Sequence, residues 1–514
     1  MATTATSGTT VQNSAPLSMR AVLVPLITII IGVFMVVLDA TAVNVALPKL
    51  VLDFHAPLNT VQWVVTGYAL AQAAVIPLAG WLSDRFGAKP LFLISIALFT
   101  AGSVLCATAQ DGGMLITFRV LQGLGGGFVL PVAMAYVYRI SPPERVGAVM
   151  GLMGIPILFA PAIGPVLGGW LVQYASWRWL FLLNLPVGIV GLIIGYLSLP
   201  ALQRQAVAAL DRFGAVLGPL AFAALSYGVS QGATSWTSNQ TIGGLIVGGL
   251  ALIAFIAVEL RTPNPLLELR VFGSIDFSFA IVVQWVGQFA LFGALFLVPF
   301  FLQQVRGFGA FDTGLAMLPQ AIAAAVVMPI GGTLFDRIGA RPLVIVGLAM
   351  VAVATYLLAQ VGVHTQAVDL ILPLALTGAG MGLMMMPLNT HLINAAPREL
   401  VSRVTSLTNA LQQVINSLTV AGLSTILTTQ IASHVASVTA AARAAHQTGP
   451  APTAAAIDAL KHSMMALGFD DTFHVMVVGA IVGAVMGLLL RRQPAVLLMK
   501  ESTAEPESSM ELAG

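Results

Sequence analysis

The chain has 514 residues, of which 58% are hydrophobic and 8% are charged, and its mean hydropathy is +0.94. The net charge of +2 excludes a strongly basic surface of the kind that binds nucleic acid. Apolar runs of about 20 residues or more are long enough to cross a bilayer core, because a helix rises about 1.5 Å per residue and the core is about 30 Å thick. We therefore expect an all-α polytopic membrane protein. Its single cysteine, Cys106, excludes an intramolecular disulfide.

The apolar runs predict fourteen membrane spans. In chain order these cover roughly residues 21–47, 59–81, 91–109, 114–138, 146–173, 178–199, 213–230, 240–259, 277–302, 313–334, 343–361, 369–394, 404–428 and 472–490. With the N-terminus inside, most Lys and Arg of the connecting loops lie on the inner side, so the positive-inside rule predicts that both termini are cytoplasmic. The polar ends, residues 1–19 and 493–514, are expected to be disordered.

The first span contains Asp39, which is the one carboxylate placed well inside a predicted span. A carboxylate at that depth is costly unless it is paired, protonated or hydrated. A structural alternative is that Asp39 caps a local helix break. The sequence Ala40-Thr41-Ala42 resembles a signal-peptidase site, but the apolar run before it is too long and the pattern continues to Pro48, so we do not expect cleavage.

A charged loop follows the second span and occurs again after the tenth. The twelve residues Gly80–Leu91 and Gly332–Leu343 share eight identical positions, which indicates a duplicated ancestor. The spans between the copies predict six helices, two extra helices and six helices, and an even number between the halves makes them parallel repeats. The expected organisation is a cytoplasmic N-terminus (1–19), an N-terminal bundle (20–200), a two-helix insertion with linkers (201–274), a C-terminal bundle (275–492) and a cytoplasmic tail (493–514).

The fourth span contains Arg119, which is the one basic residue placed well inside a predicted span. Counted from the outer helix ends, the two residues differ in depth by a distance that an arginine side chain can cover. They could pair if spans 1 and 4 are neighbours, which spacing alone cannot show.

These residues resemble the major facilitator superfamily, and in particular its fourteen-spanner drug/proton antiporters. The resemblance covers nearly the whole chain and rests on the repeated charged loop, Leu38–Pro48 in span 1, Arg119–Gly123 in span 4 and Gly164–Gly169 in span 5. One departure is Ala160, where a glycine commonly precedes the proline. The resemblance implies a major facilitator fold of two six-helix bundles with two additional central helices.

The resemblance also implies roles for these motifs. Asp39 and Arg119 would form the proton-coupling site. From the residues themselves, Asp84 is expected to face amide donors at a helix start and so hold the cytoplasmic side closed, whereas Arg85 is at least as well explained by topology alone. By resemblance, the span 5 glycines would contact the C-terminal half at a hinge that governs leak, although packing alone would also explain them. The complete gating set is Asp84, Arg85, Gly87, Lys89, Gly164, Pro165, Gly168, Gly169, Asp336 and Arg337.

Polar amides and aromatic residues within the spans are candidates for a central substrate cavity, although each is individually more typical of helix packing. The candidates are Asn44, Gln122, Gln284, Trp285, Gln288, Phe289, Asn409, Gln412 and Asn416. The segment 429–471 is too polar to span and is expected to be an external loop with some helix, broken at Gly449-Pro450. It could receive a periplasmic adaptor.

We therefore predict a proton-coupled antiporter of the inner membrane that exports drugs or other amphipathic and cationic compounds, with no cofactor or metal. The alternative is a dedicated exporter of a lipid, fatty acid, siderophore or endogenous antibiotic. An uptake symporter fits the span 5 motif less well, and a non-transporting receptor leaves Asp39 unexplained. An enzyme is not expected, because the one polar cluster near the surface, around His391, lacks a nucleophile. No phosphate-binding loop is present, so ATP is not the energy source.

Overall fold

The computed structural model describes residues 19–56, 58–142, 145–202, 210–232, 235–263, 265–362, 365–395, 400–446 and 454–490. In these ranges the regular structure is helical, and fourteen helical stretches are long and apolar enough to cross a membrane. The prediction of an all-α polytopic protein is therefore confirmed. Of the predicted disordered ends, all but residue 19 lies outside the described residues.

The helices of the N-terminal part are α1 (Met19–Ala42), η1 (Val43–Ala46), α2 (Leu47–Phe54), α3 (Leu58–Val61), α4 (Trp63–Val75), η2 (Ile76–Leu78), α5 (Ala79–Phe86), α6 (Ala88–Thr108), α7 (Gly112–Ile140), α8 (Val146–Tyr174), α9 (Arg178–Leu182) and α10 (Asn184–Ser198). The later helices are α11 (Arg212–Gly232), α12 (Asn239–Arg261), η4 (Leu269–Gly273), α13 (Ile275–Gln304), α14 (Ala310–Ile338), α15 (Ala340–Ala359), η5 (Ala367–Leu370), α16 (Ile371–Asn394), α17 (Val401–His446) and α18 (Ala454–Gly487).

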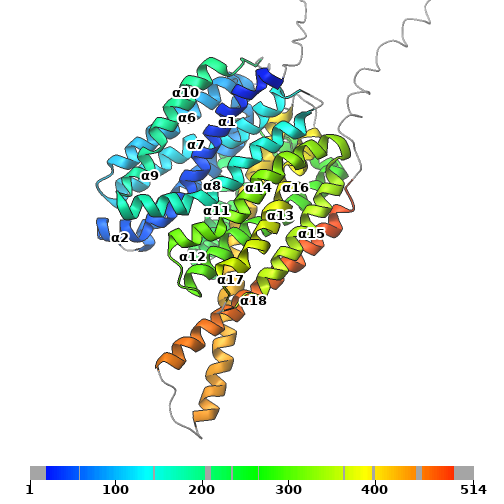
Figure 1. Cartoon of the computed structure of the whole chain (residues 1–514). Helices are drawn as coiled ribbons and strands as arrows, with labels where there is room; N and C mark the ends of the chain where they lie inside the picture. Colours follow the sequence, from blue (N-terminus) through cyan, green and yellow to red (C-terminus); the bar gives the residue numbers. More distant parts are fainter. Residues whose placement is uncertain are drawn as a thin grey trace, which may run out of the picture.

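The helices form two groups that meet along α8 and α14. Figure 1 shows the blue and cyan helices on one side and the yellow-green helices α13–α16 on the other. Helix α8 packs along α14 and also contacts α16, while α17 contacts α5 and α7. One buried apolar cluster includes residues of both groups, among them Met150 of α8 and Met328 of α14. The two groups therefore share a packed interface.

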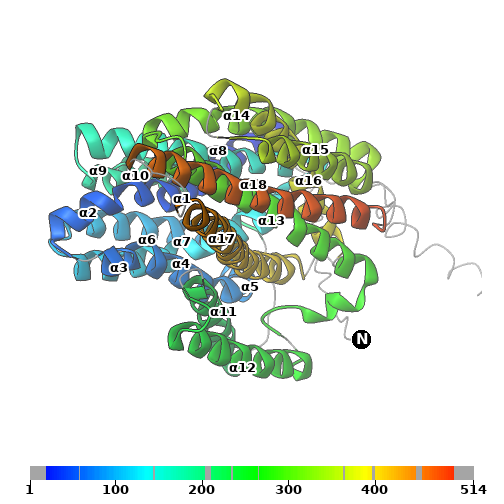
Figure 2. The ribbon, with the colours of Figure 1, turned by 90° about the horizontal axis from the view of Figure 1, so that it is seen from below.

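The two extra helices lie at the edge of the bundle. Helices α11 and α12 pack on each other, and α11 also contacts α4 and α17. Figure 2 shows the pair outside the other helices, with α11 nearer to them than α12. The insertion is thus central in sequence but peripheral in space.

The first span is not one straight helix. Helix α1 ends at Ala42, a 3-10 turn covers Val43–Ala46, and α2 begins at Leu47 with Pro48 in its first turn. Proline is tolerated there because the first amide groups of a helix have no partner within the helix. The break leaves Asp39 in the last turn of α1, close to a point where the backbone can bend.

The end of the chain differs from the expected external loop. Helix α17 continues without interruption to His446, beyond the predicted span 404–428, and α18 begins at Ala454. Alanine favours helix strongly, so the helices continue past the apolar stretches. Figure 1 shows α17 and α18 extending together beyond the other helices. A contact between His434 Nε2 and Asp471 Oδ2 at 2.8 Å joins them, whereas the predicted break at Gly449-Pro450 lies outside the described residues.

Candidate functional site

Two buried charges, one on α1 and one on α7, form an ion pair. Asp39 is 3% exposed and Arg119 is 0% exposed, and 2.5 Å separates Arg119 Nη1 from Asp39 Oδ2. Arg119 Nε donates to the backbone oxygen of Val64 at 3.1 Å, and the guanidinium carbon lies 3.9 Å from the ring centroid of Tyr68. The pairing suggested by the depths of the two residues is therefore present, because α1 and α7 are neighbours. Its role in proton coupling remains a prediction.

Three further polar side chains complete a network around this carboxylate. Asp39 Oδ1 accepts hydrogen bonds from Gln122 Nε2 at 3.1 Å and from Asn184 Nδ2 at 2.9 Å. Both amides also donate to Ser103 Oγ at 2.8 Å, and Gln122 Oε1 accepts from Arg119 Nη1 at 2.8 Å. Every group that contacts Asp39 in this network donates to it, so the arrangement fits an ionised carboxylate. Gln122 belongs to this network, although the sequence analysis placed it in a substrate cavity.

Sequence reasoning missed three members of the site. Asn184 is an amide within an apolar run, so the criterion that selected the other intramembrane amides also applies to it. Ser103 and Tyr68 give no comparable signal, because one serine or tyrosine in an apolar helix is ordinary. Only the packing of α4, α6 and α10 around α1 and α7 identifies them.

The two charged loops occupy equivalent positions at one end of the bundle, which we call the Asp84 end. Gly87 and Gly339 follow α5 and α14 with φ angles of 95° and 76°. Glycine adopts this conformation without the steric cost that a side chain adds. The repeated glycine therefore allows the sharp turn between consecutive helices in both halves.

The partners of the two loop aspartates differ from the prediction for Asp84. Asp84 Oδ1 accepts a hydrogen bond from Arg139 Nη2 at 2.9 Å, and Arg403 Nε of α17 lies 4.0 Å from Asp84 Oδ2. Asp336, in contrast, accepts from the backbone amides of Gly147 and Ala148 at 2.9 and 3.0 Å. The expected amide contact at a helix start is thus made by Asp336, at the start of α8. Arginine side chains take that place around Asp84.

Close backbone contacts join the two groups beside both aspartates. A Cβ added at Gly80 would lie 2.9 Å from the backbone oxygen of Ser402 in α17. A Cβ at Gly332, the equivalent residue, would lie 2.2 Å from the backbone oxygen of Gly147 in α8. Contacts this short exclude a side chain, so the repeated glycine permits the same approach of helices in both halves. The Asp84 end is therefore closed.

The span 5 glycines face a different neighbour from the one that the resemblance implied. A Cβ at Gly164 would lie 2.2 Å from Thr41 Oγ1, and one at Gly168 would lie 2.8 Å from the backbone oxygen of Ala42. Both contacts are with α1, within the N-terminal part. Gly164 and Gly168 are one helical turn apart and so share a face. Val166 lies on another face and contacts Gly314 of α14. The prediction of a contact with the C-terminal half is therefore wrong for these two glycines.

The remaining gating candidates have three kinds of surroundings. Arg85 and Arg337 are exposed. Lys89 Nζ donates to the backbone oxygen of Tyr196 at 2.8 Å, which ties α6 to α10 within one half. Pro165 and Gly169 are half-buried in α8. The structure thus places Arg85 and Arg337 at the surface, in agreement with a role in topology.

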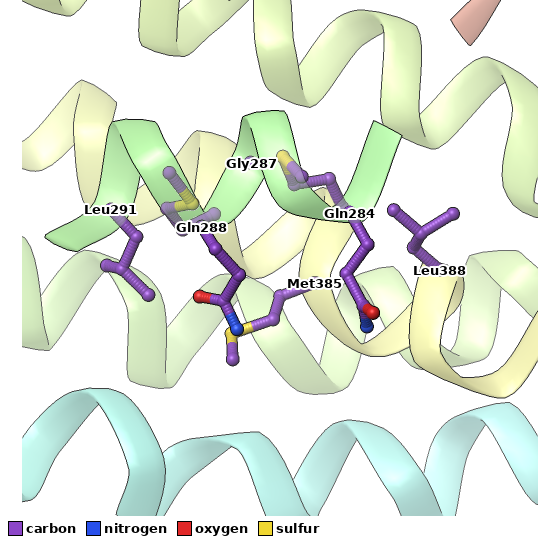
Figure 3. Close-up of a pocket in the computed structure, with 8 residues that line it drawn as sticks. Gln284, Gly287, Gln288, Leu291, Met385 and Leu388 are labelled. Atoms are coloured by element: carbon purple, nitrogen blue, oxygen red, sulfur yellow. The ribbon is translucent and has the colours of Figure 1, made fainter. Parts of the chain in front are cut away.

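A small pocket lies between α13 and α16, and it contains two of the predicted substrate residues. Figure 3 shows the carboxamides of Gln284 and Gln288 extending to the same side of α13, with Met385 beside Gln288. The pocket encloses about 10 Å³, roughly one water molecule. The complete lining is Gln284, Gly287, Gln288, Leu291, Met381, Met384, Met385 and Leu388. A drug-sized ligand therefore requires a wider conformation.

The other cavity candidates lie apart from this pocket lining. Asn44 donates to the backbone oxygen of Ala40 at 3.3 Å, and Phe289 packs against Gly479 of α18. Trp285 is not among the lining residues. Asn409 donates to the backbone oxygen of Thr405, and Gln412 donates to Asn389.

Sequence and structure comparisons give the family. The Major Facilitator Superfamily model matches residues 29–420. The chain belongs to this superfamily. The "Multidrug resistance protein B homolog" of Mycobacterium tuberculosis (strain ATCC 25618 / H37Rv) is 40% identical over 398 residues, which are 76% of this chain and 74% of that protein. The "Lincomycin resistance protein LmrB" of Listeria monocytogenes serovar 1/2a is 29% identical and covers 90% and 94% of the two chains.

A solved structure of the same superfamily shares the fold. The proton:xylose symporter XylE aligns with a TM-score of 0.61 over 93% of this chain and 97% of that chain, at 14% sequence identity. The predicted major facilitator fold is therefore confirmed, and the protein is a member of a membrane transporter family.

Proposed function

We propose that the protein is a proton-coupled antiporter that exports small amphipathic or cationic compounds across the cytoplasmic membrane. The observation that carries this proposal is the buried Asp39–Arg119 pair and its ring of hydrogen-bond donors. Burying two charges carries a desolvation penalty of several kcal/mol per ion, and apolar residues would hold the helices together equally well. Ionisable groups inside a membrane protein are therefore functional by default.

The network supplies a physical route for coupling a proton to movement. A proton added to Asp39 turns one accepting position of the carboxylate into an O–H donor. When this proton is on Oδ1, the O–H group faces the N–H donors of Gln122 and Asn184, and these hydrogen bonds weaken. The proton also weakens the attraction to Arg119, which keeps its contact with Tyr68. Asp39 then separates from these partners, and the nearby 3-10 turn Val43–Ala46 allows the end of α1 to bend.

Movement of α1 reaches the interface between the two halves through α8. Thr41, two residues after Asp39, packs directly on Gly164 of α8, and α8 packs along α14. At the Asp84 end, Asp336 caps the start of α8 and so holds this helix against α14. Protonation of Asp39 shifts α8 and releases that end, which opens the pocket between α13 and α16 to the cytoplasm.

The names of the relatives support drugs as substrates, because they describe resistance to multiple drugs and to lincomycin. The charge distribution of the loops supports an orientation with both termini in the cytoplasm. The α17–α18 extension then projects on the outer side, since α17 begins at the Asp84 end and runs away from it. An adaptor protein that docks on this extension is part of the same proposal.

The proposal is tested with purified protein in proteoliposomes under an imposed pH gradient. We expect ethidium to accumulate against its concentration gradient in the direction opposite to the proton flow, and a protonophore to abolish this accumulation. A panel that adds lipids and antibiotics separates multidrug export from a dedicated exporter, which would move one compound class. Accumulation that is insensitive to the pH gradient would contradict proton coupling.

A further inference from the structure

The C-terminal half contains five carboxamide residues that the proton site does not use, of which all but the half-buried Asn416 are buried. Gln284 and Gln288 lie one turn apart on α13, Gln412 and Asn416 lie one turn apart on α17, and Asn389 of α16 lies between them. Asn389 Oδ1 accepts hydrogen bonds from Gln284 Nε2 at 2.5 Å and from Gln412 Nε2 at 3.4 Å. We call these five residues the carboxamide cluster.

Two oxygens of the carboxamide cluster are buried without a partner. Gln284 is 5% exposed, and its Oε1 atom has no hydrogen-bond partner among the described residues. The Oδ1 atom of Asn416 is also buried and has no hydrogen-bond partner among them. The donor groups of Gln284 and Gln412, in contrast, are engaged with Asn389. A buried polar atom without a partner costs free energy, so such atoms call for an explanation. These two oxygens can each accept a hydrogen bond from a bound molecule.

The pocket that Gln284 lines is largely apolar and has no charged residue in its lining. The eight residues that line the pocket include no charged side chain, and three of them, Met381, Met384 and Met385, are methionines. Methionine is flexible and polarisable, so it adapts to apolar molecules of different shape. The acidic and basic groups of the coupling site belong to the N-terminal half. A ligand held here is selected by its hydrogen-bond donors and not by its charge.

We propose that the carboxamide cluster is the specificity site of the exporter and selects lipophilic molecules that carry N–H or O–H donors. The donors satisfy Gln284 Oε1 and Asn416 Oδ1, and the methionines and leucines contact the apolar remainder of the molecule. This inference rests on the proposed export of amphipathic compounds and specifies which of them bind. A site built to hydrogen-bond its ligand discriminates strongly against an analogue that lacks the polar group, because its own buried groups are then left unpaired.

The test compares two monovalent lipophilic cations by equilibrium binding to the purified full-length protein in detergent. Ethidium carries two primary amino groups, whereas tetraphenylphosphonium has no N–H or O–H group. We expect Gln284→Met and Asn416→Leu each to weaken ethidium binding about threefold to tenfold, the effect of losing one hydrogen bond. We expect either change to alter tetraphenylphosphonium binding less than about twofold.

Met385→Leu is the matched control, because it changes an apolar residue of the same pocket at similar volume and should affect both cations equally. Thermal unfolding of each variant verifies that it is folded. The two substitutions lie on different helices, so the test does not depend on a single variant. Equal weakening of both cations, unchanged ethidium binding in both variants, or no binding of ethidium by the wild type would overturn the inference. Because binding is measured without a proton gradient, this result is independent of whether transport is proton-coupled.

Discussion

The contact of Asp336 with the start of α8 leads to a quantitative prediction about the gate. Asp336 accepts two backbone hydrogen bonds, from Gly147 at 2.9 Å and from Ala148 at 3.0 Å. Asp336→Asn keeps one acceptor oxygen but removes the second acceptor and the negative charge. Hydrogen bonds to charged groups contribute about 1.5–3 kcal/mol each, and the interaction with a helix start contributes about 0.3–1 kcal/mol.

The expected loss is therefore about 2–3 kcal/mol of stabilisation of the closed Asp84 end, which is roughly a 30-fold to 150-fold shift toward the open state. Spin labels on cysteines at Phe86 and Ile338, which are 52% and 50% exposed, report the separation of the two halves at this end. Cys106 is buried and can stay in place. Double electron–electron resonance should show a long-distance population that increases in Asp336→Asn.

The matched control is Asp312→Asn, which makes the same chemical change in the first turn of the same helix, at the other end. Its distance distribution should equal that of the wild type. If Asp336→Asn also gives the wild-type distribution while the protein remains folded, the two amide contacts do not hold the end closed.

Three further predictions address the gate, helix packing and topology. Asp84→Asn should slow exchange severalfold at equal protein amount, because a neutral amide pairs weakly with arginine; unchanged rates across substrates would refute this role. Gly164→Val should reduce transport and lower the free energy of unfolding by about 1–3 kcal/mol, because the new side chain overlaps α1. Gly249→Val has open space around it and should change neither quantity. Equal effects of the two substitutions would contradict the packing argument. A cysteine at Thr237 should react with an impermeant thiol reagent added outside intact cells and one at Gly273 only after lysis; the reverse pattern would overturn the orientation.

The sequence was sufficient to predict the helices because hydropathy reports directly which segments cross the membrane. It did not predict where α17 ends and where α18 begins, since alanine-rich helix continues beyond the apolar stretch. Duplication was a guide to the gate, as Gly80 and Gly332 make equivalent close contacts. It failed for the partners of the two aspartates, because those partners come from other parts of the chain.

The candidate site was predictable only where a residue was conspicuous by itself. Asp39 and Arg119 are isolated charges in apolar helices, and the cost of burying them predicted their importance. Ser103, which accepts hydrogen bonds from Gln122 and Asn184, became identifiable only when α6 was placed beside α7 and α10. The neighbour of Gly164 was not predictable either, because it depends on how α8 is rotated about its axis, and the glycine pattern does not specify that rotation.

The central claim is that Asp39 carries the coupled proton. Substrate-induced proton release from purified protein in detergent, measured in weakly buffered solution with a pH indicator, tests this claim most directly. The wild type and Asp53→Asn, a change in α2 outside the buried network, should release protons when ethidium is added. Asp39→Asn should bind substrate without releasing protons, and Arg119→Ala in addition should cause little further loss, because the two groups act as one unit. Undiminished release from Asp39→Asn would place the proton elsewhere and contradict the mechanism.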